Sequence, residues 1–455
     1  MRLVSEGPLL EELSQDSGII RLKPSVACYA ESERDVEAAL FEAEKRGISV
    51  TLRGGGTSIP SQSIGTGMTL LQESNGIDWY QKGTVTAAPG VLKSDLNAFL
   101  GSKAAWMPVD PSSYRSCTVG GMVANNSSGI RTPKYGSTID FVSALRVVVP
   151  GGHGEAVGPV QLEGGGTQDK RAELVIRLLL DNQKDILDET PQVTKNSSGY
   201  RLEKVIHDGH ADLPRLFVGS EGTLGAITQV QFRTLPPPAW RLLVVAEASL
   251  ETLGGVVDAC RNLGPSAVEL VDKSIFKRMG RGDRVARYSK SDDDFMVFCE
   301  LDGAEGNQSE ALEGVAASRV GGLDPLVVSA PSEMAEAWEV RNETLTVALE
   351  IRRNGKTMLP GVEDLVVPPG RLADLVKLLS DQFGRRGLES ISYGHAGDAN
   401  LHARPLLDSS SPKDRRILDE LMAECFEAVW KMGGSMTGEH GDGMLRAPYV
   451  ARQYP

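Results

Sequence analysis

The sequence predicts an α+β fold divided into two domains. Its 455 residues exceed the size of one ordinary domain. Strand-like and helix-like patterns alternate along both halves of the chain. Between the halves, Pro236-Pro237-Pro238 cannot continue the interior of a sheet. We therefore expect a first domain over residues 1–236 and a second that begins at residue 237.

The first domain is expected to open with a strand, a helix and a second strand. Residues 25–30 are β-prone, and Ser32 with Asp35 three residues later has the spacing of a helix start. Apolar residues then recur at helical spacing until Gly47, and alternating apolar residues over 48–52 predict the second strand. Beyond these elements, the patterns predict a strand at 85–88, a short helix at 94–100, a strand at 145–149 and a β-rich stretch at 202–233.

The second domain is expected to begin with strands and helices in alternation and to continue with longer helices. Apolar runs predict strands at 242–246, 267–271 and 295–301, with helices at 250–263 and 308–320. Helical spacing then predicts helices at 331–353, 369–385 and 412–432. A strand pair is expected around 391–405, before the last of these helices.

Composition argues against several classes of function. Lys and Arg number 48 against 61 Asp and Glu, and the formal charge of −13 repels nucleic acids and anionic lipids. No apolar run approaches the ~20 residues of a membrane helix, and the N-terminus has no signal-peptide core. The five cysteines have neither zinc-site nor iron–sulfur spacing. We expect a cytoplasmic protein with no transmembrane segment and no nucleic-acid partner.

Three segments are rich in glycine and small polar residues. Residues 53–58, Arg-Gly-Gly-Gly-Thr-Ser, follow a predicted strand, and their glycines leave backbone N–H groups free to converge on an anion. An ordinary turn is the alternative interpretation. Residues 108–129 combine amides, hydroxyls and bare backbone in a stretch that we expect to be non-helical, and Val119, Met122 and Val123 argue against disorder. The third segment is 216–228, with Gly-Ser-Glu-Gly-Thr-Leu-Gly at 219–225.

Together these segments resemble the FAD-binding domain of the vanillyl-alcohol oxidase and para-cresol methylhydroxylase (PCMH) superfamily. The similar branch contains D-lactate dehydrogenase, the glycolate oxidase flavoprotein subunit and D-2-hydroxyglutarate dehydrogenase. The resemblance covers nearly the whole chain. It implies a two-part FAD-binding domain over 1–236, an α+β cap domain that carries the substrate site over 237–430, and a C-terminal segment, 431–455, that returns to the FAD domain.

The resemblance also implies how the flavin is bound. Members with covalent flavin often have a histidine after the glycines, where this sequence has Thr57, so we expect non-covalent FAD. The implied cofactor contacts are Arg53, Gly54, Gly55, Gly56, Thr57, Ser58, Pro108, Asp110, Pro111, Ser112, Ser113, Gly120, Gly121, Asn125, Gly129, Glu221, Gly222, Gly225 and Ile227.

Three of the six histidines fall in two short motifs, 394–402 and 438–443. If residues 391–395 and 400–404 are neighbouring strands, His395 and His402 face one cavity, and Glu439 completes a three-ligand site with open coordination positions. Spacing alone leaves structural hydrogen bonding as the alternative. The resemblance implies that this set binds a divalent metal ion, with zinc as the leading candidate.

His440 and Arg341 are the expected catalytic residues. His440 lies beside the proposed ligands without being one, so it can act as general base near neutral pH. A structural hydrogen-bonding role is the alternative. The resemblance places a carboxylate-binding arginine at Arg341, after Trp338, with Lys356 as a second candidate. The acidic pair Glu363-Asp364 is expected either to reach the active site or to be structural.

The expected activity is FAD-dependent oxidation of a D-2-hydroxy acid to the 2-keto acid, with D-lactate favoured and glycolate or D-2-hydroxyglutarate next. A dicarboxylate needs a further cation, from Arg352, Arg353, Lys356 or Arg404. The form of the last motif resembles long relatives that carry an iron–sulfur domain. We therefore expect an iron–sulfur domain or subunit as electron acceptor, which would place the protein at the inner membrane face, and direct oxidation by oxygen is the alternative. The alternatives are a non-catalytic electron-relay subunit, an alcohol or sugar oxidase, and nucleotide binding without redox chemistry.

Overall fold

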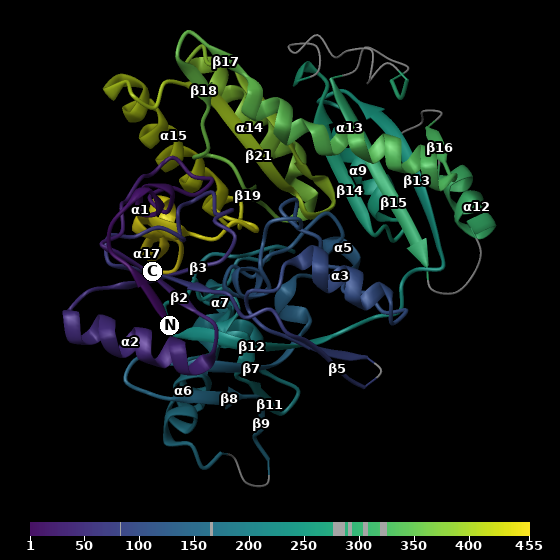
Figure 1. The fold of residues 1–455 in the computed structure, drawn as a ribbon. Coiled ribbons are helices and arrows are strands. Elements are labelled where there is room, and N and C mark those ends of the chain that lie inside the picture. The colour runs from purple at the N-terminus through teal and green to yellow at the C-terminus, as the bar shows by residue number, and fades with distance from the viewer. Residues whose placement is uncertain (82, 164–166, 276–286, 290–293, 304–307, 319–324) are drawn as a thin grey trace.

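A computed structural model describes residues 1–81, 83–163, 167–275, 287–289, 294–303, 308–318 and 325–455. Figure 1 shows two halves, each made of helices and strands, with the N-terminal half coloured purple to teal and the second half teal to yellow. The predicted α+β class is therefore confirmed. No described helix combines the length and the apolar character needed to cross a membrane.

The first half contains three sheets. One has the order β1-β2-β4-β3, the second β5-β6-β12-β7-β8 and the third β10-β11-β9. Their bounds are β1 Arg2–Val4, β2 Val26–Ala30, β3 Val50–Arg53, β4 Met68–Gln72, β5 Ile77–Gln81, β6 Thr84–Ala87, β7 Val142–Val148, β8 Gly154–Val157, β9 Pro159–Gln161, β10 Ile206–His207, β11 His210–Asp212 and β12 Ala226–Arg233.

The helices of the first half are mostly short. The first long one, α2 (Glu33–Arg46), begins at Ser32, whose hydroxyl accepts from the backbone N–H of Asp35, and ends at Gly47, which has a left-handed φ of 63°. Its apolar face packs on β2 and β4. The others are α1 Pro8–Glu12, α3 Lys93–Gly101, α4 Val119–Ala124, α5 Thr132–Tyr135, α6 Lys170–Asp181, α7 Gln183–Glu189 and α8 Pro214–Phe217, with 3₁₀ turns at Thr138–Asp140 and Leu202–Lys204.

Helix α4 corrects one expectation, because segment 108–129 is not wholly non-helical. The Thr118 hydroxyl accepts from the N–H of Gly121 and so starts the helix. Val119, Met122 and Val123 lie on its buried face. Their helical spacing overcomes the low helix propensity of the two glycines.

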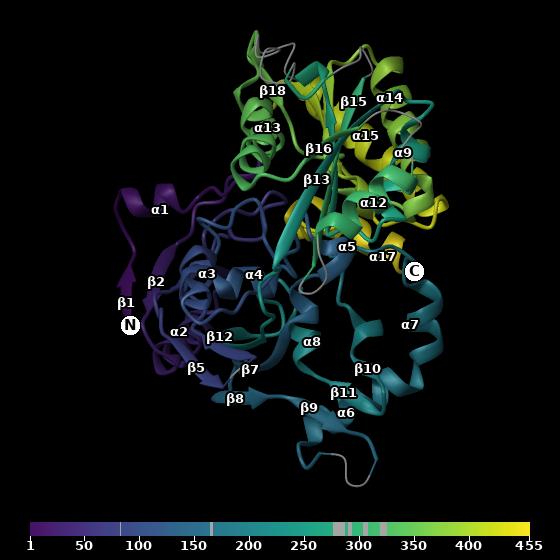
Figure 2. The same ribbon diagram turned by 90° about the vertical axis from the view of Figure 1, so that its right-hand side faces the viewer.

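The second half is built on one large sheet with the order β16-β13-β15-β14-β20-β21-β18-β17, and β19 also pairs with β21. Its helices cover both faces: Figure 2 shows α13 on one side and α9, α12, α14 and α15 on the other. The strands are β13 Trp240–Ala248, β14 Ala267–Asp272, β15 Phe295–Gly303, β16 Leu326–Val328, β17 Arg352–Arg353, β18 Lys356–Met358, β19 Leu365–Val366, β20 Ser390–His395 and β21 Asn400–Leu407, and the helices are α9 Leu253–Arg261, α12 Gln308–Ser318, α13 Pro331–Glu350, α14 Leu372–Arg385 and α15 Pro412–Lys431.

The alternation of side chains along β13 explains the two layers. Leu242 and Val244 belong to the core shared with α9, α14 and α15, whereas Leu243 and Val245 belong to the core shared with α13. A strand buried on both faces shows a continuous apolar run, as this sequence does.

Three helices of the second half differ from their expected bounds by two residues or more. The helix expected over 250–263 spans Leu253–Arg261. The helix expected over 331–353 ends at Glu350, because Arg352 and Arg353 pair with β18 instead. The helix expected over 369–385 begins with a 3₁₀ turn at Pro369–Arg371. The helix expected over 308–320 is described from Gln308 to Ser318, and the last two residues of that prediction lie outside the described part of the chain.

The C-terminal segment returns to the first half, as expected. It contains α16 (Gly443–Arg446), a 3₁₀ turn at Ala447–Tyr449, and α17 (Val450–Gln453). The carboxylate of Glu221 accepts from the backbone N–H of Asp442 at 2.7 Å and of Gly443 at 3.0 Å. The Tyr454 hydroxyl accepts from the Asn196 amide at 2.8 Å. In both views the yellow C-terminal segment lies between the two halves.

A buried ion-pair network also joins the halves. Arg131 donates to both carboxylate oxygens of Glu300 on β15, at 2.7 and 3.0 Å, and its other terminal nitrogen contacts Asp110. The Trp338 ring N–H on α13 also reaches Glu300, at 3.1 Å. Glu300 is only 1% exposed, so its charge depends on these partners.

Substitution of Arg131 by methionine should therefore destabilise the protein. It leaves the buried Glu300 carboxylate without its hydrogen-bonded counter-charge, and we expect the free energy of unfolding to fall by about 3 kcal/mol. Urea denaturation followed by tryptophan fluorescence measures this change. As a control, Arg146→Met removes the half-exposed ion pair with Glu33 and should cost about 1 kcal/mol or less. Equal losses in the two variants would contradict the prediction.

Candidate active site

The glycine-rich loops enclose a hollow of about 150 Å³ in the first half. Segments far apart in the sequence meet there, namely the loop after β3, the start of α4 and the loop before β12. The residues that line it are Tyr29, Leu52, Arg53, Gly54, Leu71, Gln72, Glu73, Pro89, Thr118, Gly120, Gly121, Ala124, Gly222, Gly225 and Ile227.

Close approach of the backbones explains the glycines of this hollow. A Cβ atom added at Gly54 would lie 2.5 Å from the Thr118 hydroxyl, and one at Gly120 would lie 2.7 Å from Cβ of Pro89. Such walls expose bare backbone to a ligand. The lining also combines polar groups and bare backbone with the apolar side chains of Leu52, Leu71 and Ile227. This combination suits a flavin nucleotide, which has both flat rings and phosphates.

The structure places the remaining predicted cofactor residues around the hollow, outside its lining. Asp110 pairs with Arg131, and Asn125 and Glu221 hold the C-terminal segment. The Gly129 carbonyl accepts from Lys195 at 3.0 Å. The predicted residues outside the lining are Gly55, Gly56, Thr57, Ser58, Pro108, Asp110, Pro111, Ser112, Ser113, Asn125, Gly129 and Glu221. Their contact with FAD stays a prediction.

Gly55→Ala should lower flavin affinity. The new Cβ would lie 2.0 Å from the backbone carbonyl oxygen of Ser116, so the loop 53–58 must move away from the segment before α4. We expect the variant to purify with less than half of the wild-type flavin, measured by its visible absorbance. The matched control is Gly76→Ala, where no atom lies within 4 Å of the added Cβ. Full flavin content in Gly55→Ala would contradict the prediction.

Three histidines and one glutamate meet next to this hollow. His395 ends β20, His402 lies on β21, and Glu439 and His440 follow α15 in the C-terminal segment. The Nε2 atoms of His395, His402 and His440 lie 3.1, 3.3 and 3.5 Å from the same oxygen, Oε1 of Glu439. The antiparallel pairing of β20 with β21 brings the first two rings together, with centroids 5.3 Å apart.

Electrostatics keep this cluster charged. Burial alone would raise the pKa of Glu439, but His395 and Lys195 outweigh it and hold that pKa well below its usual range. Burial lowers the pKa of His395, and the carboxylates of Glu269 and Glu439 overcome it, so that the pKa rises to about 9. The second oxygen of Glu439 accepts from Lys195 and from Ser128, both at 3.0 Å. Its first oxygen therefore remains directed at the imidazoles.

Two imidazole nitrogens and a carboxylate oxygen are donors that divalent transition metals prefer. His395, His402 and Glu439 offer ligand atoms that all lie within 4.8 Å of one another. A bound cation would replace the proton that His395 otherwise takes up. The residues therefore fit the metal site that was expected, and their role as ligands stays a prediction.

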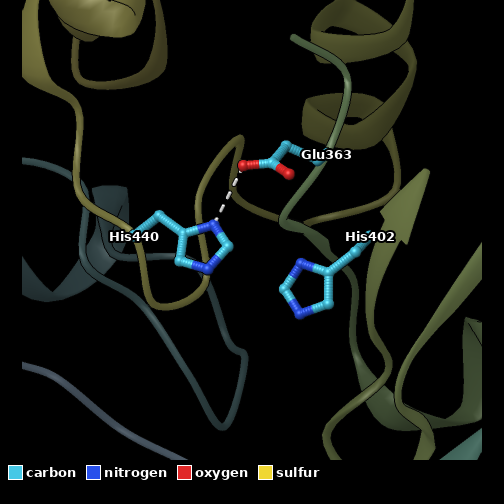
Figure 3. Close-up of side chains that lie close together, drawn as sticks. All are labelled: Glu363, His402 and His440. Carbon is cyan, nitrogen blue, oxygen red and sulfur yellow. Dashed lines mark hydrogen bonds and ion pairs between the residues drawn. The ribbon is translucent and has the colours of Figure 1, made fainter. Parts of the chain in front are cut away.

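Glu363, His402 and His440 form a second group of the same kind (Figure 3). Figure 3 shows the His440 ring directed at the Glu363 carboxylate, and Nδ1 lies 3.1 Å from its Oε1. The other oxygen of Glu363 is 2.5 Å from Nη2 of Arg404. One oxygen of Glu439 faces three imidazole nitrogens, whereas Glu363 hydrogen-bonds one, so the Glu439 group is the better candidate for a cation.

The acidic pair 363–364 has two different tasks. The Asp364 carboxylate accepts from the backbone N–H groups of Glu439, at 3.1 Å, and His440, at 2.8 Å, so it shapes the loop that carries both. Glu363 reaches the active-site imidazole itself. The sequence left open whether this pair reaches the active site or is structural. Glu363 reaches the active site, and Asp364 is structural.

The role of Arg341 at a substrate carboxylate stays a prediction. Its guanidinium is buried and donates through Nε at 2.8 Å and Nη2 at 2.5 Å to Glu269, so it is already paired with a carboxylate of the protein. Lys356 is half-exposed near Asp414. Of the four cations considered for a dicarboxylate, only Arg404 is buried, beside Tyr393, whereas Arg352 and Arg353 are exposed.

Sequence reasoning missed three residues of the cluster. Glu269 lies in a β-strand, Lys195 precedes a small-residue run, and Ser128 ends the second glycine-rich segment. They lie 126, 244 and 311 residues from their partners in the cluster. Of the three, Glu269 alone has a sequence pattern that indicates a buried functional residue, because it is a charged residue within an apolar strand.

Comparison with known proteins now identifies the class. Residues 24–157 match the family model for an FAD binding domain, and residues 237–455 match the model for the C-terminal domain of FAD linked oxidases. The chain belongs to the FAD-linked oxidases, and FAD is its cofactor.

The chain is also similar to individual proteins of known activity. The chain is 26% identical over 437 residues to glycolate oxidase subunit GlcD of Bacillus subtilis, covering 94% of this chain and 82% of the relative. It is 28% identical over 468 residues to D-lactate dehydrogenase of Anaerostipes hadrus, covering 97% and 86%. It is 28% identical over 480 residues to D-2-hydroxyglutarate dehydrogenase of Escherichia coli, covering 96% of this chain but 46% of that relative.

Solved structures confirm the expected PCMH-type fold. The structure of p-cresol methylhydroxylase with substrate bound has a TM-score of 0.68 at 13% identity, covering 100% of this chain and 88% of the other. Alkyldihydroxyacetonephosphate synthase has a TM-score of 0.66 at 15% identity, covering 99% and 80%.

Proposed function

We propose that this protein is an FAD-dependent dehydrogenase that oxidises a D-2-hydroxy acid to the 2-keto acid, with D-lactate as the favoured substrate and glycolate or D-2-hydroxyglutarate next. The observation that carries the proposal is the cluster of His395, His402, Glu439 and His440 beside the flavin hollow. In this assignment residues 1–236 bind FAD, residues 237–430 form the substrate domain, and 431–455 bring Glu439 and His440 to the flavin.

The C-terminal loop connects the cluster to the hollow. The Asn125 amide donates to the Glu439 carbonyl at 2.8 Å, and Ala124, its neighbour, lines the hollow. Glu221 holds the same loop three residues further on, at Asp442, beside Gly222 of the lining. A substrate bound at the cluster therefore lies next to the flavin.

Oxidation of a 2-hydroxy acid removes a proton from the hydroxyl and a hydride from the α-carbon. FAD, when bound, supplies the hydride acceptor at N5. His440 takes the hydroxyl proton on Nε2, because Glu363 holds its Nδ1 and fixes the ring. Its pKa is lowered by burial but raised more by Asp364 and Glu363, which favours proton uptake.

His395, His402 and Glu439 would hold a divalent ion, zinc as the first choice, through Nε2, Nε2 and Oε1. Such an ion supplies Lewis-acid chemistry that lowers the pKa of the substrate hydroxyl. Arg341 contributes to the substrate carboxylate through Nη1, which has no hydrogen-bond partner among the described residues. We propose an iron–sulfur domain or subunit as electron acceptor, which would place the protein at the inner membrane face.

Anaerobic mixing tests the proposal. The purified, metal-analysed protein is mixed separately with D-lactate, L-lactate, glycolate and D-2-hydroxyglutarate, and bleaching of the yellow flavin band is recorded. Bleaching by one D-acid, lost after chelation, supports the proposed reaction and identifies the substrate. A yellow protein that none of these acids reduces contradicts it and favours the electron-relay subunit.

A further inference from the structure

Glu269 lies on β14 and is fully buried between two functional groups. Each oxygen of its carboxylate contacts a different one of these two groups. Oε1 is 2.7 Å from Nδ1 of His395, and Oε2 accepts from Nε and Nη2 of Arg341. One side chain therefore contacts both the histidine cluster and the proposed carboxylate-binding arginine.

The contact with His395 fixes the ring. A carboxylate at Nδ1 holds the N–H on that nitrogen, so that in the cation-bound ring the lone pair is on Nε2. Nε2 is the atom that faces Glu439, at 3.1 Å. A ring held in this tautomer and orientation presents its lone pair toward the position between His402 and Glu439.

The contact with Arg341 fixes the guanidinium. Two of its nitrogens donate to a single oxygen, and the side chain is 5% exposed. Because Glu269 holds Nε and Nη2, the guanidinium cannot rotate freely, and the direction of Nη1 is fixed. The arginine is thus ordered before any substrate arrives.

We propose that Glu269 is a positioning residue that aligns the metal-binding histidine and the substrate-binding arginine together, through its two carboxylate oxygens. The arginine half of this inference rests on the proposed function. The histidine half needs only that the cluster binds a divalent cation.

Glu269→Gln in the holoenzyme tests both halves. A carboxamide has one acceptor oxygen, and its NH₂ group must face either the His395 N–H or the Arg341 N–H groups, so one partner meets a donor. We expect zinc affinity, measured by chelator competition, to fall 10- to 100-fold. We expect KM for the substrate acid to rise about tenfold or more, while FAD content stays near one per chain.

Asp302→Asn is the matched control. Asp302 is another buried carboxylate of the same sheet, on β15, where it accepts from Lys134 at 2.6 Å and from Tyr135 at 2.9 Å. It touches neither the histidines nor Arg341. We expect a lower melting temperature with wild-type zinc affinity and KM. If Glu269→Gln matches this control in zinc affinity and KM, the proposal is wrong.

Two further measurements cover a variant that fails to fold and a failure of the proposed function. If Glu269→Gln does not fold because Arg341 is left buried and unpaired, Glu269→Gln/Arg341→Gln removes that charge, and its zinc affinity should still fall 10- to 100-fold. Unchanged zinc affinity in the folded double variant overturns the histidine half. Flavin reduction of the wild-type protein by the D-acids separates the two proposals, because its absence contradicts the proposed function and not the alignment of His395.

Discussion

His440→Ala should lower the rate constant of flavin reduction by the D-acid about 10²- to 10⁴-fold. The reaction needs an acceptor for the hydroxyl proton, and His440 is the one imidazole of the cluster that lies outside the three-ligand group. FAD and zinc should remain bound, because their proposed contacts are intact. Anaerobic stopped-flow absorbance measures the rate, and metal analysis checks the zinc.

His153→Ala is the control for the loss of an imidazole. The His153 side chain is 93% exposed, and its ion-pair partner, Glu37, is not a residue of the cluster. The variant should reduce its flavin at the wild-type rate. Glu363→Gln gives an intermediate case, because it weakens the contact that orients His440. Reduction at the wild-type rate in His440→Ala would refute the assignment of the base.

Glu439→Gln is expected to have the second large effect, on metal binding and stability together. It neutralises the oxygen at which the three imidazoles converge, so zinc should be lost on dialysis and reduction should slow roughly a hundredfold or more. It also leaves Lys195, which is 2% exposed, without its closest carboxylate. Asp398, at 3.6 Å, remains as a more distant partner of Lys195, so we expect stability to fall by about 2 kcal/mol from the weakened pairing.

Ser128→Ala is the matched control for Glu439→Gln. It removes one hydrogen bond, of 3.0 Å, from the second oxygen of Glu439 and leaves the charge in place. The expected cost is about 1 kcal/mol of stability, with zinc retained. Calorimetry and metal analysis of the two variants distinguish the charge from the hydrogen bond. A Glu439→Gln protein that keeps its zinc and its rate would contradict the assignment.

Local patterns predicted the parts of the fold that depend on local physics. The cap at Ser32 and the stop at Gly47 depend on neighbouring backbone groups, so the sequence alone indicated α2. The apolar run of β13 indicated a strand because burial on both faces leaves no polar position. The last turn expected for α13 was lost at Arg352, because pairing with β18 outweighed helix propensity there.

The site was predictable only where its residues share a motif. His395 and His402 were placed on facing strands because a short turn joins them. Glu269 is different, because β14 pairs with β20 across more than a hundred residues of sequence, and no local pattern encodes that partner. The interaction of Arg341 with Glu269 was missed for the same reason, since the register of β14 decides which side chain faces α13.

The return of the C-terminal segment makes the flavin site and the proposed metal site dependent on one another. Glu439 belongs to a loop that Asn125 and Glu221 fasten to the wall of the flavin hollow, while His395 and His402 come from the other half. Binding at either site therefore restrains a loop that the other requires, and such linkage is reciprocal by thermodynamic necessity. Flavin-depleted protein should release zinc more readily than the holoprotein, and zinc-depleted protein should release FAD more readily.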